Sequence, residues 1–411
     1  MAVEEVTESL TVPLKDVLRR VETGWSPVCE PRPPAGDEWG VLKLSAVTSG
    51  SFLREETKTL PRDTAPRPAL EVNPGDVLMS RANGVKALVG VVCAVNEVRR
   101  KLLIPDLVFR LVADPEVLDP GFLAIALAST AARQQLDEVM RGSSGQYKIS
   151  QADVRILRVP KMPLPEQHRI VAVHAAFERR IGALEATLGK VRTVDQALSA
   201  EALAPAQRDA WDQVPLESVA TVAAGVTLGS EPVGDGTVEL PYLRVANVLD
   251  GRIDTTDVKR VRILSTQISR YALKRGDLLL TEGGDLDKLG RGAVWDGRNE
   301  SCLHQNHVFR VRCRERMVPD FLALYTASPA GRAYFQRVGK QTTNLASINS
   351  TQVKKMPVPV PPLEEQQLLL EPIRAARKRA EALDTQIAKL RTVQQAVVEG
   401  LLTGRTEASA T

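Results

Sequence analysis

A nine-residue stretch that occurs twice places the strongest constraint on the fold of this chain. KVRTVDQAL at 190–198 returns as KLRTVQQAV at 389–397, with six of nine positions identical, in a sequence of 411 residues. Further matches occur in the same order at offsets of 199 to 202 residues: VPLKDV (12–17) with VPLESV (214–219), PGDVLMSRANG (74–84) with RGDLLLTEGGD (275–285), and PLPEQHRI (163–170) with PLEEQQLL (362–369). An ordered series at one offset indicates a tandem duplication rather than two unrelated domains with chance similarities.

Each half of the duplication is long enough to be a whole domain. Solenoid repeats have periods of roughly 20–50 residues, whereas a repeat of about 200 residues can enclose its own core. Two similar domains in one chain can be related by a pseudo-twofold axis, as the subunits of a homodimer are. The composition, with 43% hydrophobic and 25% charged residues, is typical of a globular protein.

Composition also narrows the cellular setting. The start, MAVEEVTESL, is acidic and lacks the basic and apolar regions of a secretory signal, and no apolar run is as long as a membrane span. We therefore expect a cytoplasmic protein with no membrane partner. The four cysteines (Cys29, Cys93, Cys302 and Cys313) are too few for a disulfide framework. A net charge of +4 permits nucleic-acid binding without requiring it.

The first ~160 residues of each half predict a mixture of strands and helices, so the expected fold class is α+β. Short β-rich runs alternate with Gly, Pro and Asp turns, and a helix is expected at 120–140 and at 319–338, where Pro329 should break or kink the second copy. Each half then reaches a proline-rich stretch, VPKMPLP (159–165) or MPVPVPP (356–362), which should be extended and end the globular domain.

The last ~40 residues of each half predict a long amphipathic helix. Apolar residues recur every three or four positions, at Ile170, Val173, Phe177, Ile181, Leu184, Leu188, Val191, Val194 and Leu198, and in the second copy at Leu369, Ala376, Ala380, Leu383, Ile387, Leu390, Val393, Val397 and Leu401. Pro372 is expected to kink the second helix or delay its start. Each stripe could cover its own domain, but the matched spacing favours an antiparallel coiled coil with pseudo-twofold symmetry.

These patterns define five expected segments. Two heads lie at 1–162 and 209–361, the two spacer helices at 163–208 and 362–404, and a flexible tail at 405–411. A helix of roughly 35 residues is about 50 Å long. Two heads held at that separation suit a polymer with recurring sites, and neighbouring grooves on one face of DNA recur every ~34–36 Å. Adding one or two helical turns between 190 and 200 should then lengthen the spacing and leave both half-sequences unchanged.

The order of head, helix, head and helix resembles the specificity subunit of Type I restriction-modification enzymes. The resemblance rests on the P-L-x-E-Q helix starts (Pro163 to Gln167 and Pro362 to Gln366), the strands after Gly75 and Gly276, and the loops GSSGQYKIS and GKQTTNLASI. It implies two target recognition domains, a split double-stranded DNA site and assembly with two copies of a methyltransferase subunit. Whether a restriction (translocase) subunit joins them stays open. The chain departs from the pattern at Pro372 and at Glu282, which matches Arg81.

The sequence contains no convincing catalytic motif. The polar-Pro-Pro-aromatic loop of adenine methyltransferases is approached only by NPGD (73–76) and DPGF (119–122), and the second of these is an ordinary helix start. No phosphate-binding G-x-x-x-x-G-K-[ST] motif is present. We therefore expect a targeting subunit with no catalytic residue, and S-adenosylmethionine, ATP and Mg only on partner subunits. The alternatives are a non-catalytic protein adaptor and a self-sufficient methyltransferase or nuclease with an unfamiliar site.

One group of residues could suggest a metal. Cys302, His304, His307 and Cys313 lie within twelve residues, but their spacing matches no common zinc module. In a strand over HVFRVRC, His307 and Cys313 share a face and His304 lies opposite. We expect these residues to be structural, with no metal ligand.

The candidate DNA-binding residues lie in polar loops after strands, at matched places in both halves. Arginine and asparagine read guanine and adenine through paired hydrogen bonds, and lysine more often holds phosphate. In the first half the candidates are Arg81, Asn83 and Lys86 from SRANGVK, with Ser143, Gln146, Tyr147 and Lys148 from GSSGQYKIS. In the second half they are Lys288, Arg291, Lys340, Gln341, Thr343 and Asn344.

Polar residues also recur at matched places on the two long helices, namely Gln167, Arg192, Gln366 and Arg391. We expect them to face outward, and a shared ligand such as two identical methyltransferase subunits would explain the recurrence. A solvated helix face would explain it as well.

Overall fold

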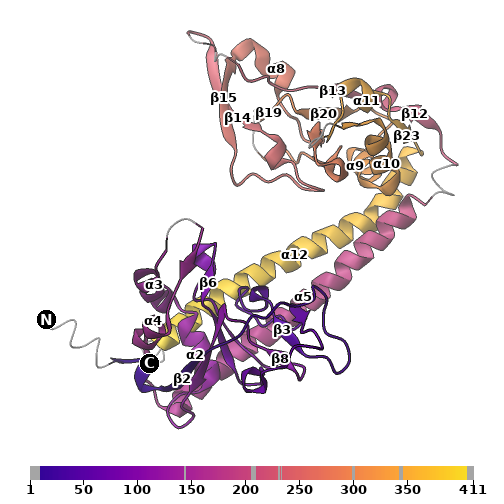
Figure 1. Ribbon diagram of the computed structural model, residues 1–411. Coiled ribbons are helices and arrows are strands. Elements are labelled where there is room, and N and C mark those ends of the chain that lie inside the picture. Colours follow the sequence, from indigo (N-terminus) through magenta and orange to yellow (C-terminus); the bar gives the residue numbers. More distant parts are fainter. Residues whose placement is uncertain are drawn as a thin grey trace. The chain divides into compact units, whose positions relative to one another are not determined.

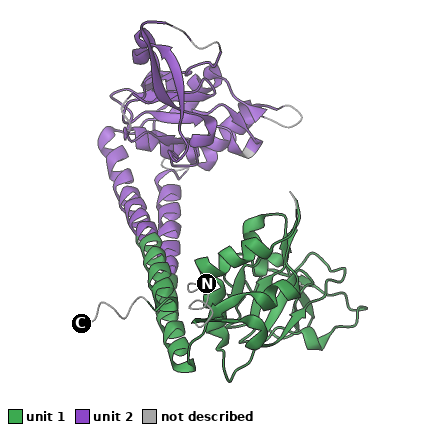
Figure 2. Cartoon of the chain, turned by 90° about the vertical axis from the view of Figure 1, so that its left-hand side faces the viewer, with its two compact units in different colours: residues 1–184, 386–411 green, residues 185–385 purple. Residues whose placement is uncertain are grey.

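The computed structural model describes residues 10–142, 145–204, 210–229, 232, 234–298, 301–341 and 346–404. They form two compact units (Figure 2): unit 1 contains residues 1–184 and 386–411, and unit 2 contains residues 185–385. The division passes through both long helices, so each unit holds one head with the beginning of one helix and the end of the other. The candidate residues Ser143, Thr343 and Asn344 and the tail expected at 405–411 lie outside the described residues.

The head of unit 1 contains a four-stranded antiparallel sheet and a three-stranded mixed sheet (Figure 1). The four-stranded antiparallel sheet has the order β2 (Leu18–Thr23), β9 (Val108–Ala113), β5 (Val77–Ser80) and β7 (Val92–Ala94). The three-stranded sheet has the order β4 (Thr57–Thr59), β3 (Gly40–Leu42) and β8 (Leu102–Leu103), with β3 and β8 parallel. The remaining elements of the head are α2 (Pro120–Leu127), α3 (Thr130–Val139), α4 (Gln151–Ile156), β6 (Ala82–Asn83), β10 (Tyr147–Lys148), β1 (Thr11–Pro13) and β11 (Arg158–Pro160).

Unit 2 repeats this architecture and adds one short strand, β21. Its four-stranded sheet has the order β13 (Ala220–Ala223), β20 (Val308–Cys313), β16 (Leu278–Thr281) and β18 (Gly292–Val294). Its three-stranded sheet consists of β15 (Lys259–Leu264), β14 (Thr237–Leu243) and β19 (Leu303–His304), again with one parallel pair. The other elements are α7 (Leu216–Val219), α8 (Ile268–Tyr271), α9 (Pro319–Ala327), α10 (Pro329–Val338), α11 (Ser350–Lys354), β12 (Gln213–Pro215), β17 (Gly283–Gly284), β21 (Lys340–Gln341), β22 (Ala346–Ser347) and β23 (Pro357–Pro359). The predicted tandem duplication of an α+β head is confirmed.

The central strands are largely apolar because both faces of the four-stranded sheet are covered, although each unit also buries one arginine there, Arg110 or Arg310. In unit 1, Val77, Met79 and Phe109 belong to one buried cluster. Their sequence neighbours Leu78 and Val108 belong to a second cluster. Successive side chains of a strand point to opposite faces, so a strand between two cores has no polar alternation. This arrangement explains the runs DVLMS and DLLLT, whose strand residues are buried in both units.

The helix expected at 120–140 is two helices, contrary to the sequence prediction. α2 ends at Leu127 and α3 begins at Thr130, because Ser129 adopts an extended backbone and its side chain accepts a hydrogen bond from the Ala132 amide. Ser328 caps α10 in the same way, accepting from the Gly331 amide. The break predicted at Pro329 is therefore confirmed, but the serine before it produces the same break in the copy that lacks proline.

The two long helices are α5 (Leu164–Ala202) and α12 (Leu363–Leu402), and they run antiparallel. In unit 1 the start of α5 packs with the end of α12, since Ile170, Val398 and Leu402 share one core. In unit 2 the end of α5 packs with the start of α12 in the same manner. α12 begins at Leu363, at the place matching the start of α5, and continues through Pro372. The expected antiparallel pairing is confirmed, and the expected delay at Pro372 is wrong.

The inward face of these helices differs from the predicted stripe at one matched position. Val194 and Val393 are 51% and 48% exposed, whereas Gln394 is buried. Inside unit 1, Gln394 Nε2 donates to Glu178 Oε1 over 2.6 Å.

The two helices also form ion pairs with each other inside unit 2. Arg192 pairs with Asp384 at 2.9 Å and Arg377 pairs with Asp195 at 3.1 Å. Position 195, and its match 394, therefore face the neighbouring helix, and the valine before each faces solvent.

A buried glutamine ties each long helix to its own head. Gln167 and Gln366 are 2% and 0% exposed, so the expectation that they face outward is wrong. Gln366 Oε1 accepts from the Val318 amide at 2.8 Å, and its Nε2 donates to the carbonyls of Arg316 and Pro361. Gln167 makes the same three bonds, with the Asp119 amide and the carbonyls of Val117 and Met162. The glutamine of P-L-x-E-Q is thus a connection between the helix start and the turn before α2 or α9.

We expect Gln366→Leu to lower the free energy of unfolding of unit 2 by about 3 kcal/mol, because it leaves one N–H and two carbonyls at the start of the helix without their partner. Thermal and denaturant unfolding of the full chain would measure the loss. Gln367→Leu is the matched control, since Gln367 is the next residue and is exposed. Equal stability of the two variants would contradict the role assigned to Gln366.

Candidate nucleic-acid interface

In unit 1 a small two-stranded ladder brings the two candidate loops together. β5 ends at Ser80, Arg81 follows, and β6 pairs antiparallel with β10, with Asn83 opposite Tyr147. The Ile149 amide donates to the Arg81 carbonyl at 3.0 Å. The backbones of Arg141 and Lys148 form an isolated antiparallel β-bridge. Loops more than 60 residues apart in the sequence therefore form one surface, which we call the rim of unit 1 (residues 81–86, 141–142 and 145–149).

Unit 2 forms a rim at the matching place (residues 282–291, 340–341 and 346–348). Glu282 follows β16, β17 pairs with β22, and β22 pairs with β21, so that Ala346 lies opposite both Gly284 and Gln341. The Ile348 amide donates to the Glu282 carbonyl at 2.8 Å, which repeats the Ile149–Arg81 bond of unit 1. The loops predicted in the second half are brought together as well.

The side chains at the rim of unit 1 are mostly basic or amide. Gln146 and Lys148 are exposed, and Tyr147 is half-buried. The Arg81 guanidinium lies 5.6 Å from the centre of the Phe109 ring, and its Nη1 donates to the Asp106 carbonyl at 3.3 Å. This surface offers hydrogen-bond donors and positive charge.

Asn83 and Lys86 have local partners on the same rim. Asn83 Oδ1 accepts from the Val85 amide at 2.9 Å, which leaves its NH2 group for other contacts. Lys86 is exposed and lies 3.9 Å from the Asp137 carboxylate. The pKa of Asp137 is lowered, chiefly by a hydrogen bond from Arg133, so this carboxylate stays ionised and partly offsets the Lys86 charge.

The rim of unit 2 carries less free positive charge than predicted. Lys288 forms an ion pair with Asp285, and its hydrogen bond lowers the pKa of that carboxyl group. Arg291 is half-buried, while Lys340 and Gln341 are exposed. The sequence prediction omitted Glu282 and His307, whose side chains meet at 2.7 Å. The mismatch of Glu282 with Arg81 was the only signal in the sequence that pointed to this pair.

Comparison with known proteins agrees with this arrangement. Residues 208–389 match the model of the Type I restriction modification DNA specificity domain. Over 164 residues the chain is 34% identical to the specificity subunit of the Type I restriction enzyme EcoEI from Escherichia coli, covering 39% of this chain and 27% of that protein. Over 371 residues it is 20% identical to the EcoKI specificity subunit of Escherichia coli K12, covering 84% of this chain and 77% of that protein. The chain is thus similar to Type I specificity subunits, over residues 208–389 to their DNA specificity domain and over most of its length to the EcoKI subunit.

A solved structure shows the same fold over the whole chain. The crystal structure of the Type I restriction-modification system S subunit from M. genitalium matches with a TM-score of 0.55 and 12% identity, covering 95% of each chain. The sequence match to the EcoEI subunit spans only about a quarter of that protein, whereas the match to the EcoKI subunit spans about three quarters.

The nine-residue repeat is identical at its exposed positions and different at its buried or half-buried positions. The six identical pairs are all exposed: Lys190 and Lys389, Arg192 and Arg391, Thr193 and Thr392, Val194 and Val393, Gln196 and Gln395, and Ala197 and Ala396. The three pairs that differ, at 191, 195 and 198 and their matches, are half-buried or buried. Packing constrains buried positions more than exposed ones, so packing does not explain this pattern. We call the six exposed positions of each helix the repeated face.

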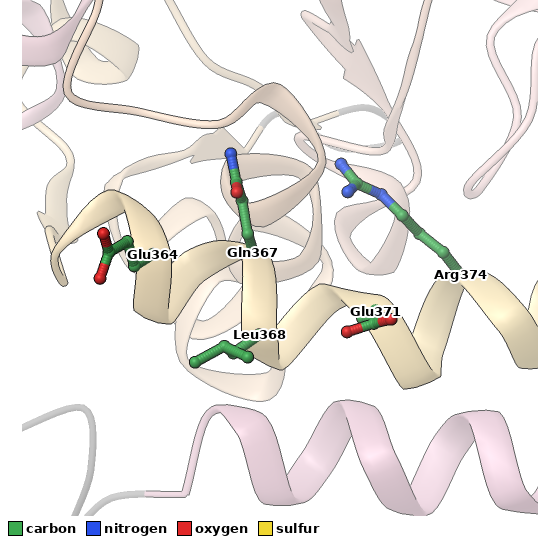
Figure 3. A pocket seen from close by; sticks show the side chains of 5 residues that line it. All are labelled: Glu364, Gln367, Leu368, Glu371 and Arg374. Carbon is green, nitrogen blue, oxygen red and sulfur yellow. The ribbon is translucent and has the colours of Figure 1, made fainter.

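A further helix surface in unit 2 has no counterpart in the first copy. A pocket of about 550 Å3 lies along the first turns of α12, lined by Glu364, Gln367, Leu368, Glu371 and Arg374 (Figure 3). Leu368 is 68% exposed there. Arg169 stands at the place that matches Leu368 in α5. The pocket therefore does not belong to the repeated face.

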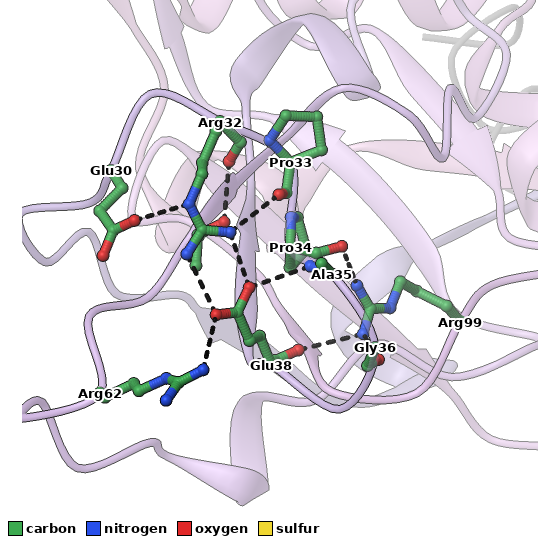
Figure 4. A network of polar contacts seen from close by, with 10 residues as sticks. Glu30, Arg32, Pro33, Pro34, Ala35, Gly36, Glu38, Arg62 and Arg99 are labelled. Atoms are coloured by element: carbon green, nitrogen blue, oxygen red, sulfur yellow. Dashed lines mark hydrogen bonds and ion pairs between the residues drawn. The ribbon is translucent and has the colours of Figure 1, made fainter.

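Two arginines of unit 1, Arg32 and Arg99, bind the segment 30–38 and are unsuited to hold phosphate. The Arg32 guanidinium donates to both carboxylate oxygens of Glu38, at 2.7 and 3.0 Å, and this bond lowers the pKa of Glu38 to about 2 (Figure 4). Arg99 donates to the carbonyls of Pro34, Gly36 and Glu38. These bonds hold the segment 30–38 in one conformation.

The residues of DPGF and NPGD and the two histidines near Cys302 make local contacts. Asp119 of DPGF caps α2 by accepting from the Phe122 amide, and Asp76 of NPGD accepts from the Asn73 amide. His304 is buried, its Nδ1 lies 2.8 Å from the Val308 carbonyl, and burial lowers its pKa to about 4. His307 instead pairs with Glu282. Within the described part of the chain, no three metal-binding side chains come together and none of the helices is long and apolar enough to span a bilayer.

Proposed function

We propose that this chain is a specificity subunit that reads a bipartite DNA sequence, with one half-site at the rim of each unit. The observation that carries the proposal is that one scaffold presents different side chains in the two units. Arg81, Asn83 and Lys148 of unit 1 correspond to Glu282, Gly284 and Ser347 of unit 2, although the strand pairing around them is the same. A shared backbone with unlike functional groups is expected of two readers with different targets.

Most of the affinity should come from phosphate contacts and fall with salt, and sequence preference should come from the rims. Selection of DNA by the full chain assembled with its methyltransferase subunit, from a library with two randomised segments at variable spacing, should return two unlike half-sites. Salt-independent binding or no binding would favour the protein-adaptor alternative. Methylation or cleavage of DNA by the purified chain alone would favour the self-sufficient enzyme.

The repeated face supports two copies of one partner. An identical set of exposed side chains on two copies of a helix presents the same contacts twice, and a duplicated chain can in this way bind two identical subunits. Since the subunit carries no recognised catalytic motif, the partner we propose is the methyltransferase subunit. S-adenosylmethionine would bind to that partner, and ATP and Mg to a restriction subunit where one is present. A cytoplasmic location follows from a DNA substrate.

A further inference from the structure

The pair formed by Glu282 and His307 occupies the most tightly fixed position on the rim of unit 2. β16 and β20 are paired as far as Thr281 and Val308. The Glu282 amide donates to the His307 carbonyl at 3.0 Å, so these residues extend the ladder by one step. The Glu282 carbonyl then accepts from Ile348. The backbone of Glu282 is therefore held on both sides, by the main sheet and by the small rim sheet.

The side chains of this pair remain accessible although the backbone is fixed. The side chain of Glu282 is 30% exposed and that of His307 is 55% exposed. His307 Nδ1 donates to Glu282 Oε2 at 2.7 Å, which sets the direction of the carboxylate. Among the described residues, none forms a hydrogen bond or ion pair with the other oxygen, Oε1. That atom can accept a hydrogen bond from a ligand.

The charge at this position is opposite to that in unit 1. Arg81 occupies the matching place there, with the same two backbone bonds, to Leu107 and Ile149. A carboxylate repels phosphate, so Glu282 cannot serve as a backbone anchor. A carboxylate at a DNA-facing edge is useful when it accepts a hydrogen bond from a base. In the major groove the amino groups of cytosine and adenine are the donors available.

We infer that Glu282, positioned by His307, is a specificity-determining residue of unit 2 that accepts a hydrogen bond from the exocyclic amino group of a cytosine or adenine. His307 is a positioning residue, because it acts through the carboxylate. The inference rests on the proposed function. It extends the set of reading residues to an acidic position and predicts that the two half-sites differ at the base pairs facing Arg81 and Glu282.

The competing explanation is that the Glu282–His307 contact is only structural and holds the turn before β20 against the rim. The two explanations differ in what Glu282→Ala and Glu282→Gln change. If the contact is only structural, the two substitutions lower the stability of unit 2 and do not change the base preference. A reading residue affects the preference at one base pair of one half-site and leaves the other half-site unchanged.

The test is DNA selection by the assembled enzyme, with both half-sites randomised. Glu282→Ala should lower the discrimination at one base pair of the unit 2 half-site by roughly tenfold or more, the value expected for one good base contact. Glu282→Gln should shift the same base pair toward adenine, since glutamine binds adenine through paired hydrogen bonds. His307→Asn should weaken the same preference by a smaller factor.

Two controls make the result decisive. Glu315→Gln removes one negative charge from an exposed position of unit 2 outside the rim and should change no base preference. Arg81→Ala should change only the other half-site. If Glu282→Ala reduces folding, the near-isosteric Glu282→Gln decides. An unchanged preference at every base pair in both Glu282 variants overturns the inference. If the wild-type assembly selects no bipartite site, the proposed function itself fails.

Discussion

Arginine in place of Val194 or Val393 is expected to remove one of two bound partner subunits, and the double substitution is expected to remove both. Each valine is about half exposed at the centre of its repeated face. If a partner covers that face, a new guanidinium is buried there without a counter-charge, at a cost of several kcal/mol. The affinity for that copy should fall at least about a hundredfold. Native mass spectrometry of the co-expressed assembly would measure the change from two copies to one, and to none.

Ala186→Arg and Thr385→Arg are the matched controls for this experiment. These positions also correspond to each other in the duplication, and both are exposed on the same two helices. They differ from Val194 and Val393 in one respect, because their residues are not identical in the two copies. They should keep two partners. Retention of both copies by the double valine variant would show that the repeated face is not the docking surface.

The architecture could be predicted from the sequence because the duplication encodes each element twice, in two different sequences. A pattern that appears in both copies is stronger evidence for an element than a pattern in one. The antiparallel helix pair and the α+β heads follow from matches that recur in order. The error at Val194 has a physical cause, since spacings of three and four both fit an amphipathic helix. Whether position 194 or position 195 is buried depends on which side of the helix the neighbouring helix packs. Sequence spacing alone does not determine that side.

Other features could not be predicted because they depend on very short or tertiary contacts. β6, β10, β17 and β22 are two residues long, below the length at which alternation is detectable. Gln167 and Gln366 were placed outside because glutamine is mostly exposed. Their burial follows from three backbone groups that the head presents at the start of each helix. The role of Glu282 became visible only when His307, 25 residues later, was found beside it.

Lengthening both long helices by 22 residues is expected to lengthen the gap between half-sites by about one turn of DNA. The insertions belong after Leu184 and after Thr385, where the compact units divide, so that the contacts inside each unit are kept. An insertion between 190 and 200 in α5 alone would separate Arg192 from Asp384 and Asp195 from Arg377. Twenty-two residues add about 33 Å and about six helical turns. That length is close to one DNA turn of 10–10.5 base pairs.

Matched insertions of 11 residues distinguish a spacer from a flexible tether. They add about 16 Å and three helical turns, which corresponds to half a turn of DNA. Half-sites displaced by half a turn face opposite sides of the duplex, so we expect weak binding at every spacing. The 22-residue variant should recover binding, with both half-sequences unchanged and the gap longer by about ten base pairs. DNA selection at variable spacing measures both. Equal binding by the two variants at many spacings would show that the helices do not set the distance between the readers.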